Sequence, residues 1–202
     1  MNLEEKLKKL YNNFFSLGYF GVDEGEWFPD VATWIEERRK AKERFRKLFL
    51  LENLEYLEEE DFKKFLFFKY NYAWTKLYRT GLQALNDFER VKEAIRFLQN
   101  EDIDIITRIR EVVDINGRYH VRGIGRNIAT GILHIVDDKD RYGVWNNVVE
   151  RALRKLNVFP KISADPGITY YRINEVLNYL KKIINSDLLV LDSLLWFIDK
   201  YT

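Results

Sequence analysis

The chain has 202 residues, of which 47% are hydrophobic, 15% aromatic and 32% charged. This composition excludes a disordered chain and provides enough apolar material for a substantial core. The formal net charge of +1 excludes a protein-wide field that would attract nucleic acid, so a basic site has to be local. The absence of cysteine excludes disulfides, thiolate nucleophiles and cysteine-based zinc sites.

The sequence predicts a cytoplasmic protein with no membrane partner. Its first ten residues, MNLEEKLKKL, carry mixed charge and lack the apolar core of a signal peptide. The longest apolar stretch, LLVLDSLLWFI, is about half as long as a membrane span and contains Asp192. Two histidines are too few for a histidine-rich metal centre, so no metal site is predicted.

Apolar residues recur at helical spacing through nearly the whole chain, which predicts an all-α fold. Three prolines and ten glycines leave little material for turns, so long elements with few corners are expected. We predict one helical domain over residues 1–202, with its N-terminal helices in 1–55. The predicted helices span residues 2–17, 31–50, 60–69, 87–99, 102–115, 126–136, 147–157, 170–185 and 187–200.

Capping and turn residues mark the boundaries between these helices. GYFGVDEGEWFPD is predicted as a loop that ends with Asp30 as the N-cap of the second helix. YNYAWTKLYRTG follows the helix over 60–69, and Gly81 is placed to end the helical run. FPKISADPGI contains two of the three prolines and is predicted as a loop.

The stretch HVRGIGRNIATGILHIV, residues 120–136, predicts a turn that binds phosphate. The first glycine would allow a positive φ at the corner, Ile124 would pack inward, and the second glycine would let a backbone approach. The helix that follows has free N–H groups and a positive dipole end, which suit an anion. Residues 115–136 contain no acid. The candidate DNA-backbone ligands are Arg118, His120, Arg122, Gly123, Gly125, Arg126 and Asn127.

This stretch has three other interpretations besides phosphate binding. A dinucleotide-binding fingerprint needs a third glycine where Ile128 stands, and it needs a preceding strand. A Walker A loop needs a Gly-Lys-Ser/Thr sequence, which does not follow here. A plain helix-ending turn with incidental arginines remains an alternative.

VRGIGRNIATGILHIV resembles the helix-hairpin-helix element of the DNA glycosylase superfamily, whose hairpin binds a DNA backbone through main-chain amides. In that superfamily an apolar helix, a loop and a short valine-led motif follow, and DDKDRYGVWNNVVERALRKL resembles that order. The resemblance implies a glycosylase-like helix-hairpin-helix core over residues 60–200 and DNA as a partner. It also implies that hairpin carbonyls can hold a cation, although no other cofactor is predicted.

The catalytic residues of that superfamily are not matched. Asn127 stands where bifunctional members carry a lysine nucleophile, and Trp145 or Asn146 stands where they carry an aspartate. An amide cannot activate water as a carboxylate does. No catalytic residue is therefore predicted, and binding is favoured over catalysis. The alternative, a divergent glycosylase or lyase, would need a displaced acid, for which the candidates are Asp137, Asp138 and Asp140.

A second resemblance comes from FKYNYAWTKLYRTG, GIGRNIATGILHIV, RYGVWNN and LDSLLWF taken together. They resemble a helical domain found alone or fused to restriction-type ATPases and nucleases in prokaryotes. The resemblance implies work on DNA in defence or repair, with a nuclease or ATPase as a further partner. A third hypothesis is a module that binds a partner protein through exposed aromatics and the basic helix over 36–47.

Tryptophans, asparagines and an arginine predict a pocket for an unpaired base, because stacking needs an aromatic plane and a base edge needs amides. As an alternative, Tyr70 and Tyr78 share helical spacing with one of these tryptophans, which is typical of a core face. One asparagine is expected to cap a helix. His134 and Trp196 are expected in the core. The candidate base pocket comprises Trp74, Arg79, Trp145, Asn146 and Asn147.

Overall fold

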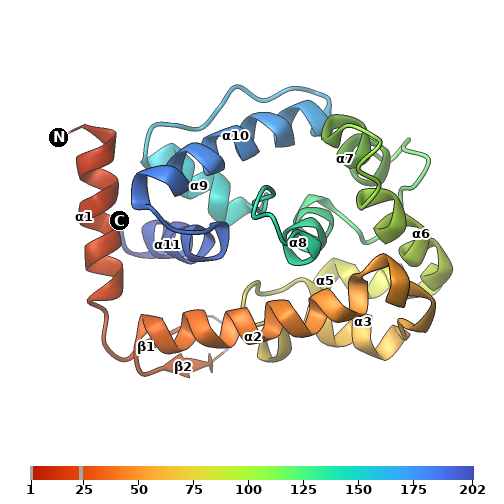
Figure 1. Ribbon diagram of the computed structural model, residues 1–202, viewed down its shortest axis with the longest axis horizontal. Coiled ribbons are helices and arrows are strands. Elements are labelled where there is room, and N and C mark those ends of the chain that lie inside the picture. The colour runs from red at the N-terminus through yellow and green to blue at the C-terminus, as the bar shows by residue number, and fades with distance from the viewer. Residues whose placement is uncertain (1, 23–24) are drawn as a thin grey trace.

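Helices follow one another along nearly the whole chain in the computed structural model, which describes residues 2–22 and 25–202 (Figure 1). None of the described helices is long and apolar enough to cross a membrane. The first half holds α1 (Leu3–Phe15), α2 (Val31–Phe49), α3 (Glu59–Leu66), α4 (Phe68–Asn71), α5 (Tyr78–Gly81) and α6 (Phe88–Leu98). The second half holds α7 (Ile105–Val113), α8 (Arg126–Val136), α9 (Asn147–Lys155), α10 (Pro166–Ile184) and α11 (Leu188–Tyr201). The 3-10 helices η2 (Leu51–Tyr56) and η3 (Leu82–Asp87) precede α3 and α6.

Polar caps explain where several helices begin. The Asp30 carboxylate accepts a hydrogen bond from the N–H of Thr33 at 2.7 Å, which confirms the predicted cap of α2. Asn2 and Glu5 form a reciprocal capping box at the start of α1. Such caps satisfy first-turn N–H groups that have no partner within the helix.

A short antiparallel strand pair lies in the segment predicted as a plain loop. β1 (Phe20–Gly21) pairs with β2 (Trp27–Phe28), and Phe20 lies opposite Phe28. The part of that prediction that falls on residues 23–24 lies outside the described residues. Two residues per strand are too few for the alternation that reveals strands in a sequence, so the pattern could not predict them.

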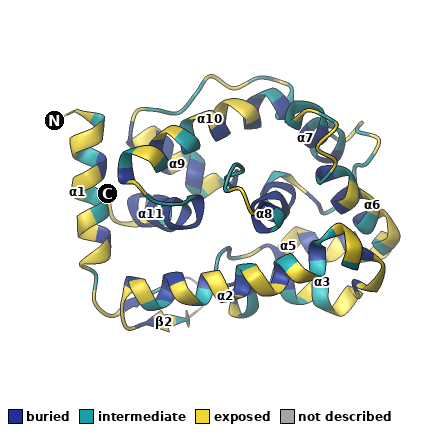
Figure 2. Ribbon diagram, viewed as in Figure 1, coloured by how far each residue is buried: buried dark blue, intermediate teal, exposed yellow. Residues whose placement is uncertain are grey.

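α8 lies at the centre of the molecule, with α10 on one side and α2 on the other (Figure 1). Its residues are buried without interruption from 128 to 135, and Figure 2 shows the helix in dark blue. Gly131 lies against the Trp74 ring, where even a Cβ would only just reach van der Waals contact at 3.4 Å. The central helix therefore contributes apolar area on all sides, which is the main favourable term in folding.

The N-terminal helices join the same core as the rest of the chain, as expected for the predicted single domain. The rings of Trp34 in α2 and Trp196 in α11 meet edge to face at 4.9 Å. Arg38 in α2 forms a buried ion pair with Asp192 in α11 at 2.5 Å. The expected packing of Trp196 in the core is confirmed.

Several helix bounds differ from the prediction, and the predicted helix over 60–69 is divided at Phe67 into α3 and α4. α10 begins at Pro166, inside the predicted loop, because Asp165 caps it and proline is favoured in the first turn. α5 ends at Gly81, as predicted, but the φ of Gly81 is −60° and the chain continues into η3. A Cβ at Gly81 would lie 2.6 Å from a Leu66 methyl carbon, so the glycine provides space for packing rather than a positive φ.

Candidate nucleic-acid interface

The turn before α8 has the backbone geometry that the glycine spacing predicts. The N–H of Ile124 donates to the carbonyl of Val121 at 2.9 Å, and Gly123 has a φ of +102°. A Cβ at Gly123 would lie 2.6 Å from the carbonyl oxygen of Thr80, so the turn is held tightly against α5. The Ile124 side chain is 1% exposed, which confirms that it packs inward. The turn is thus fixed against α5 at Gly123, while Gly125 is exposed to solvent.

The start of α8 presents uncapped N–H groups to the surface. Gly125 is exposed and extended, and no side chain caps the helix at this end. The Gly125 carbonyl accepts from the N–H groups of Ile128 and Ala129 at 3.1 and 3.0 Å. The N–H groups of Arg126 and Asn127 precede the first intrahelical bonds, and the positive end of the helix dipole lies beside them. This end of α8 is therefore suited to an anion.

Arg122 is exposed within this turn, and Arg118 is exposed four residues earlier in the chain, where its N–H donates to the Glu111 carboxylate at 2.9 Å. The Nε of Arg122 donates to Oε1 of Gln83 in η3 at 3.0 Å, so the guanidinium is oriented while its charge stays unpaired. The Arg118 guanidinium lies over the Tyr119 ring at 5.5 Å. Arg79 of α5 is also exposed and directly precedes Thr80, whose carbonyl contacts the turn. Among described residues, Arg79 and Arg122 form no ion pair.

Arg126, in contrast, is already paired. Its guanidinium lies 2.7 Å from the Glu150 carboxylate and donates to Oδ1 of Asn147 at 2.5 Å. It also lies over the Trp145 ring at 4.7 Å. Although residues 115–136 contain no acid, α9 places one beside the turn, so the charge of Arg126 is largely neutralised.

The other two predicted backbone ligands make local contacts. His120 is half-buried, and its Nδ1 lies 3.3 Å from the carbonyl oxygen of Val112 in α7. The Oδ1 of Asn127 accepts from the N–H of Ile128 at 3.0 Å. Asn127 therefore already engages a first-turn N–H of α8, and its own N–H stays available.

The five residues of the candidate base pocket do not form an open pocket. Trp74 and Trp145 are only 7% and 5% exposed, so neither indole face can stack on a base. Nε1 of Trp74 donates to Asp192, whereas Nε1 of Trp145 donates to Glu150. The predicted base platform is therefore not available, because both indoles belong to the core. Trp74 lies between α4 and α5 rather than on a helix, so the helical spacing that was the alternative explanation does not account for its burial.

The two asparagines and Arg79 have separate environments. Asn146 is the N-cap of α9, and its Oδ1 accepts from the N–H of Val149 at 2.9 Å. Asn147 contacts Arg126, so the amide left over by capping serves an arginine rather than a base. Arg79 lies on the surface of α5, away from these amides in sequence and near the turn before α8.

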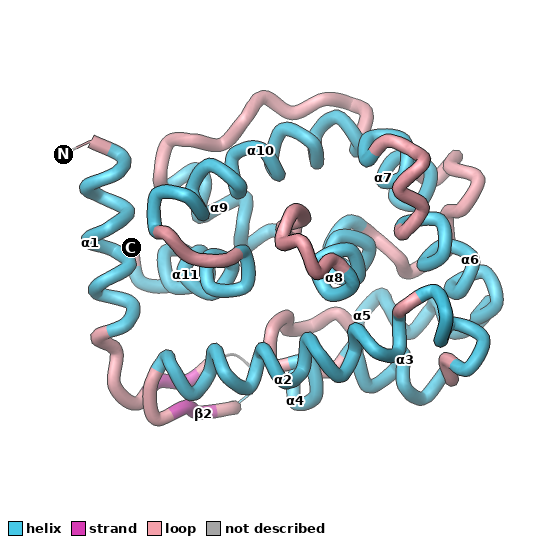
Figure 3. Tube along the Cα trace, viewed as in Figure 1, coloured by secondary structure: helices cyan, strands magenta, loops and turns pink. Residues whose placement is uncertain are grey.

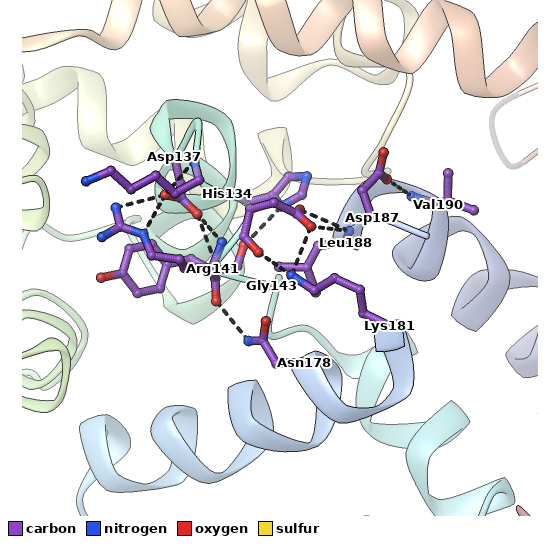
Figure 4. Close-up of polar contacts among 12 residues, drawn as sticks. His134, Asp137, Arg141, Gly143, Asn178, Lys181, Asp187, Leu188 and Val190 are labelled. Carbon is purple, nitrogen blue, oxygen red and sulfur yellow. Dashed lines mark hydrogen bonds and ion pairs between the residues drawn. The ribbon is translucent and has the colours of Figure 1, made fainter. Parts of the chain in front are cut away.

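The acidic loop after α8 is built on aspartates that hold its own backbone (Figures 3 and 4). The buried Asp137 carboxylate accepts from the N–H groups of Arg141 and Tyr142 and pairs with the Arg141 guanidinium at 2.8 Å. Asp140, at a φ of +52°, accepts from the N–H of Leu188 at 3.0 Å and from Lys181 at 2.9 Å. Both acids thus have a structural role.

The remaining acid of that loop is the least engaged. The Asp138 side chain is 63% exposed and lies 3.4 Å from Arg46. Asp138 follows the end of α8, whereas the turn with Gly123 and Gly125 precedes its start. A helix of this length places the two ends about 15 Å apart. The displaced-acid hypothesis therefore has no acid beside the predicted phosphate-binding turn in this loop.

Sequence reasoning missed the partners that other elements bring to the turn. Gln83 comes from η3 and Glu150 from α9, far from the glycines in sequence. The sequence did indicate where Glu150 lies on its helix, because it follows Asn146 by four residues and so falls in the first turn of α9. Such contacts depend on tertiary packing and leave no periodic pattern.

Comparisons with known proteins return no match. No protein-family model matches the sequence, and no curated protein or solved structure matches the chain.

Proposed function

We propose that this chain is a DNA-binding domain that holds one phosphate backbone at the turn and helix start over residues 121–127. Main-chain N–H groups at the exposed start of α8 contact phosphate oxygens directly. Arg122, Arg118 and Arg79 add charge around them. The observation that carries the proposal is the turn itself, in which a positive-φ glycine is locked against α5 while the helix start above it stays uncapped.

Gly123 and Gly125 have different environments within the turn, and this difference supports backbone binding over a plain helix-ending turn. Gly123 packs against Thr80 of α5, and Ile124 is buried. These two contacts hold the turn in place against the core. Gly125 is not packed against another element in this way, because a Cβ there would contact only the Asn127 side chain at 3.6 Å. A bare, exposed backbone at this position is what a close phosphate contact needs.

We propose contacts to the DNA backbone and none to the bases. Phosphate contacts position a protein on DNA but do not carry sequence information. With both indoles buried, no aromatic face of the predicted pocket is available for stacking. We therefore expect affinity that depends strongly on salt and only weakly on sequence.

The test measures duplex affinity by fluorescence anisotropy from low to moderate salt. Arg79→Ala with Arg122→Ala removes the two unpaired cations nearest the turn. Each lost phosphate contact should lower the slope of log K against log salt by about 0.9, so the double variant should lose about 1.8. Lys8→Ala with Lys9→Ala is the matched control, because it removes the same charge from exposed positions of α1, at the other end of the molecule (Figure 1).

The control separates local contacts from the effect of net charge. The proposal expects the α5 and turn variant to bind at least about tenfold more weakly at low salt, with the α1 variant close to wild type. Equal losses in both variants would show that binding is diffuse. Wild-type protein that binds no duplex at low salt would contradict the proposed function itself.

A further inference from the structure

Lys42 of α2 lies between two cavities at the opposite end of α8 from the turn. One is an open groove of about 470 Å³, lined by Lys42, Leu189 and the acidic loop after α8. The other is a small cavity of about 10 Å³, which Lys42 and Leu189 share with His134 and Arg38. A volume of that size accommodates about one water or one hydroxyl group.

The acids around Lys42 each have a cation of their own. Lys42, by contrast, forms no hydrogen bond or ion pair with any described residue. The pairs are Asp187 with Arg39 at 2.5 Å, Asp138 with Arg46 at 3.4 Å, Asp140 with Lys181 at 2.9 Å, and Asp137 with Arg141 at 2.8 Å. The Lys42 amine thus has no partner among the described residues, and each aspartate of the groove is paired with another cation.

Three buried polar atoms beside these cavities also lack partners. They are Nε of Arg38, Nε of Arg46 and Nε2 of His134. His134 is only 3% exposed, and its Nδ1 lies 3.0 Å from the Tyr142 carbonyl, so Nδ1 carries the proton and Nε2 is an acceptor. Buried polar atoms are normally satisfied, and a concentration of unsatisfied ones indicates a missing partner.

We propose that Lys42 is a reactive amine that binds a small uncharged hydroxyaldehyde as an imine, with the ligand hydroxyl in the cavity beside His134. A hydroxyl group both donates and accepts, so it can donate to Nε2 of His134 and accept from Nε of Arg38. Five acids and three cations line the groove, whereas Arg141 and Lys181, the partners of two of these acids, do not line it, and this disfavours an anionic aldehyde. This site is independent of the proposed DNA contact.

The chemical step needs no oxidant, reductant or metal. The Lys42 amine attacks the carbonyl carbon, and the carbonyl π pair moves to oxygen, which takes a proton. The carbinolamine then loses water and forms the C=N bond. The two hydrogens of the neutral amine leave with the carbonyl oxygen as water, so aldehyde and amine balance with imine and water.

Burial supports the presence of the neutral amine that this step requires. Desolvation lowers the pKa of Lys42 from its usual value, despite the nearby aspartates. Lys40, two residues earlier on the same helix, is exposed, and the carboxylates of Glu37 and Glu36 raise its pKa. Each unit of difference in pKa changes the neutral fraction about tenfold at neutral pH. Lys40 therefore serves as an internal reference for the reactivity of Lys42.

The test incubates the full chain with glycolaldehyde and sodium cyanoborohydride at pH 7 and maps labelled lysines by mass spectrometry. The hydride reduces the imine to a stable secondary amine. We expect Lys42 to be labelled at least about tenfold faster than Lys40. A parallel reaction with glyoxylate, an anionic aldehyde of similar size, should give a smaller ratio of Lys42 to Lys40.

Labelling of Lys42 at or below the rate of Lys40 would overturn the proposal without the need for any variant. A larger ratio with glyoxylate would overturn the assignment to uncharged aldehydes. His134→Leu removes the ring acceptor without supplying another and should lower labelling of Lys42 several-fold while Lys40 is unchanged. If a variant that remains folded by circular dichroism keeps the wild-type ratio, His134 does not position the ligand.

Discussion

The two ends of α8 use charge in opposite ways. At its start, the helix has no side-chain cap, and Arg122 lies exposed and forms no ion pair with a described residue. At its end, Asp137 is buried, accepts backbone hydrogen bonds and pairs with Arg141. Apart from Arg126, which pairs with Glu150, the start of α8 therefore leaves its charge and its first N–H groups available to a partner, while the other end uses its acids to build the fold.

This difference separates two kinds of polar residue that look alike in a sequence. A buried carboxylate that satisfies several donors stabilises the fold, and its loss leaves those donors without partners. An exposed cation contributes little to stability because water solvates it in both states. Substitutions at the two ends of α8 should therefore separate stability from binding.

Asp137→Ala should have the largest effect on stability. It removes a buried acceptor of backbone N–H groups and leaves Arg141 without one of its two carboxylate partners. We expect a loss of about 3–5 kcal/mol in the free energy of unfolding, measured by urea denaturation. Asp138→Ala is the matched control, since that side chain is exposed and should cost less than about 0.5 kcal/mol. Similar losses for both would refute the structural role of Asp137.

Gly123→Ala should come next, at the other end of the helix. A φ of +102° is strained for alanine, and the new Cβ would lie 2.6 Å from the Thr80 carbonyl. We expect a loss of about 2–3 kcal/mol in unfolding free energy. Gly125→Ala is the control, because a Cβ there meets nothing closer than 3.6 Å. Equal costs for the two glycines would contradict the turn geometry described above.

Much of the fold could be predicted from residue spacing. The bounds of α8 match the predicted 126–136, because an apolar run follows a glycine turn and ends at an acidic loop. The start of α10 differs from the prediction because Pro166 is a first-turn residue after the Asp165 cap rather than a loop residue. Local patterns thus predict helices well where caps and periodicity agree.

The candidate site could be predicted only in its local part. The positive φ of Gly123 and the burial of Ile124 follow from spacing alone. The pairing of Arg126 with Glu150 depends on how α9 packs, and no pattern within residues 115–136 reveals it. Helical spacing offered a core role for Trp74, but the residue lies between α4 and α5, so its burial comes from tertiary packing that the spacing does not describe. Lys42 gave no signal because its basic run is typical of a solvated helix face.

The pH dependence of stability should show a smaller effect, centred on His134. Burial lowers its pKa well below the usual value of 6.5, so the folded state resists protonation that the unfolded state accepts. Stability is therefore highest above about pH 6.5 and falls as the pH drops below it, by at most about 1.4 kcal/mol per pH unit. Urea denaturation between about pH 5.5 and 7.5 would measure it. His134→Gln should flatten this slope, and a variant with the wild-type slope would assign it to other groups.

Arg122→Ala should have the smallest effect on stability and the clearest effect on binding. Its guanidinium is exposed and contacts only Gln83 among described side chains, so the free energy of unfolding should change by less than about 0.5 kcal/mol. Duplex affinity should nevertheless fall, and its salt slope should decrease by about 0.9. Gln83→Ala keeps the charge but removes the side chain that orients it, so it should lower affinity less and leave the slope unchanged. A large loss of stability in Arg122→Ala would show that the start of α8 also uses its charges for folding, and the contrast between the two ends would fail.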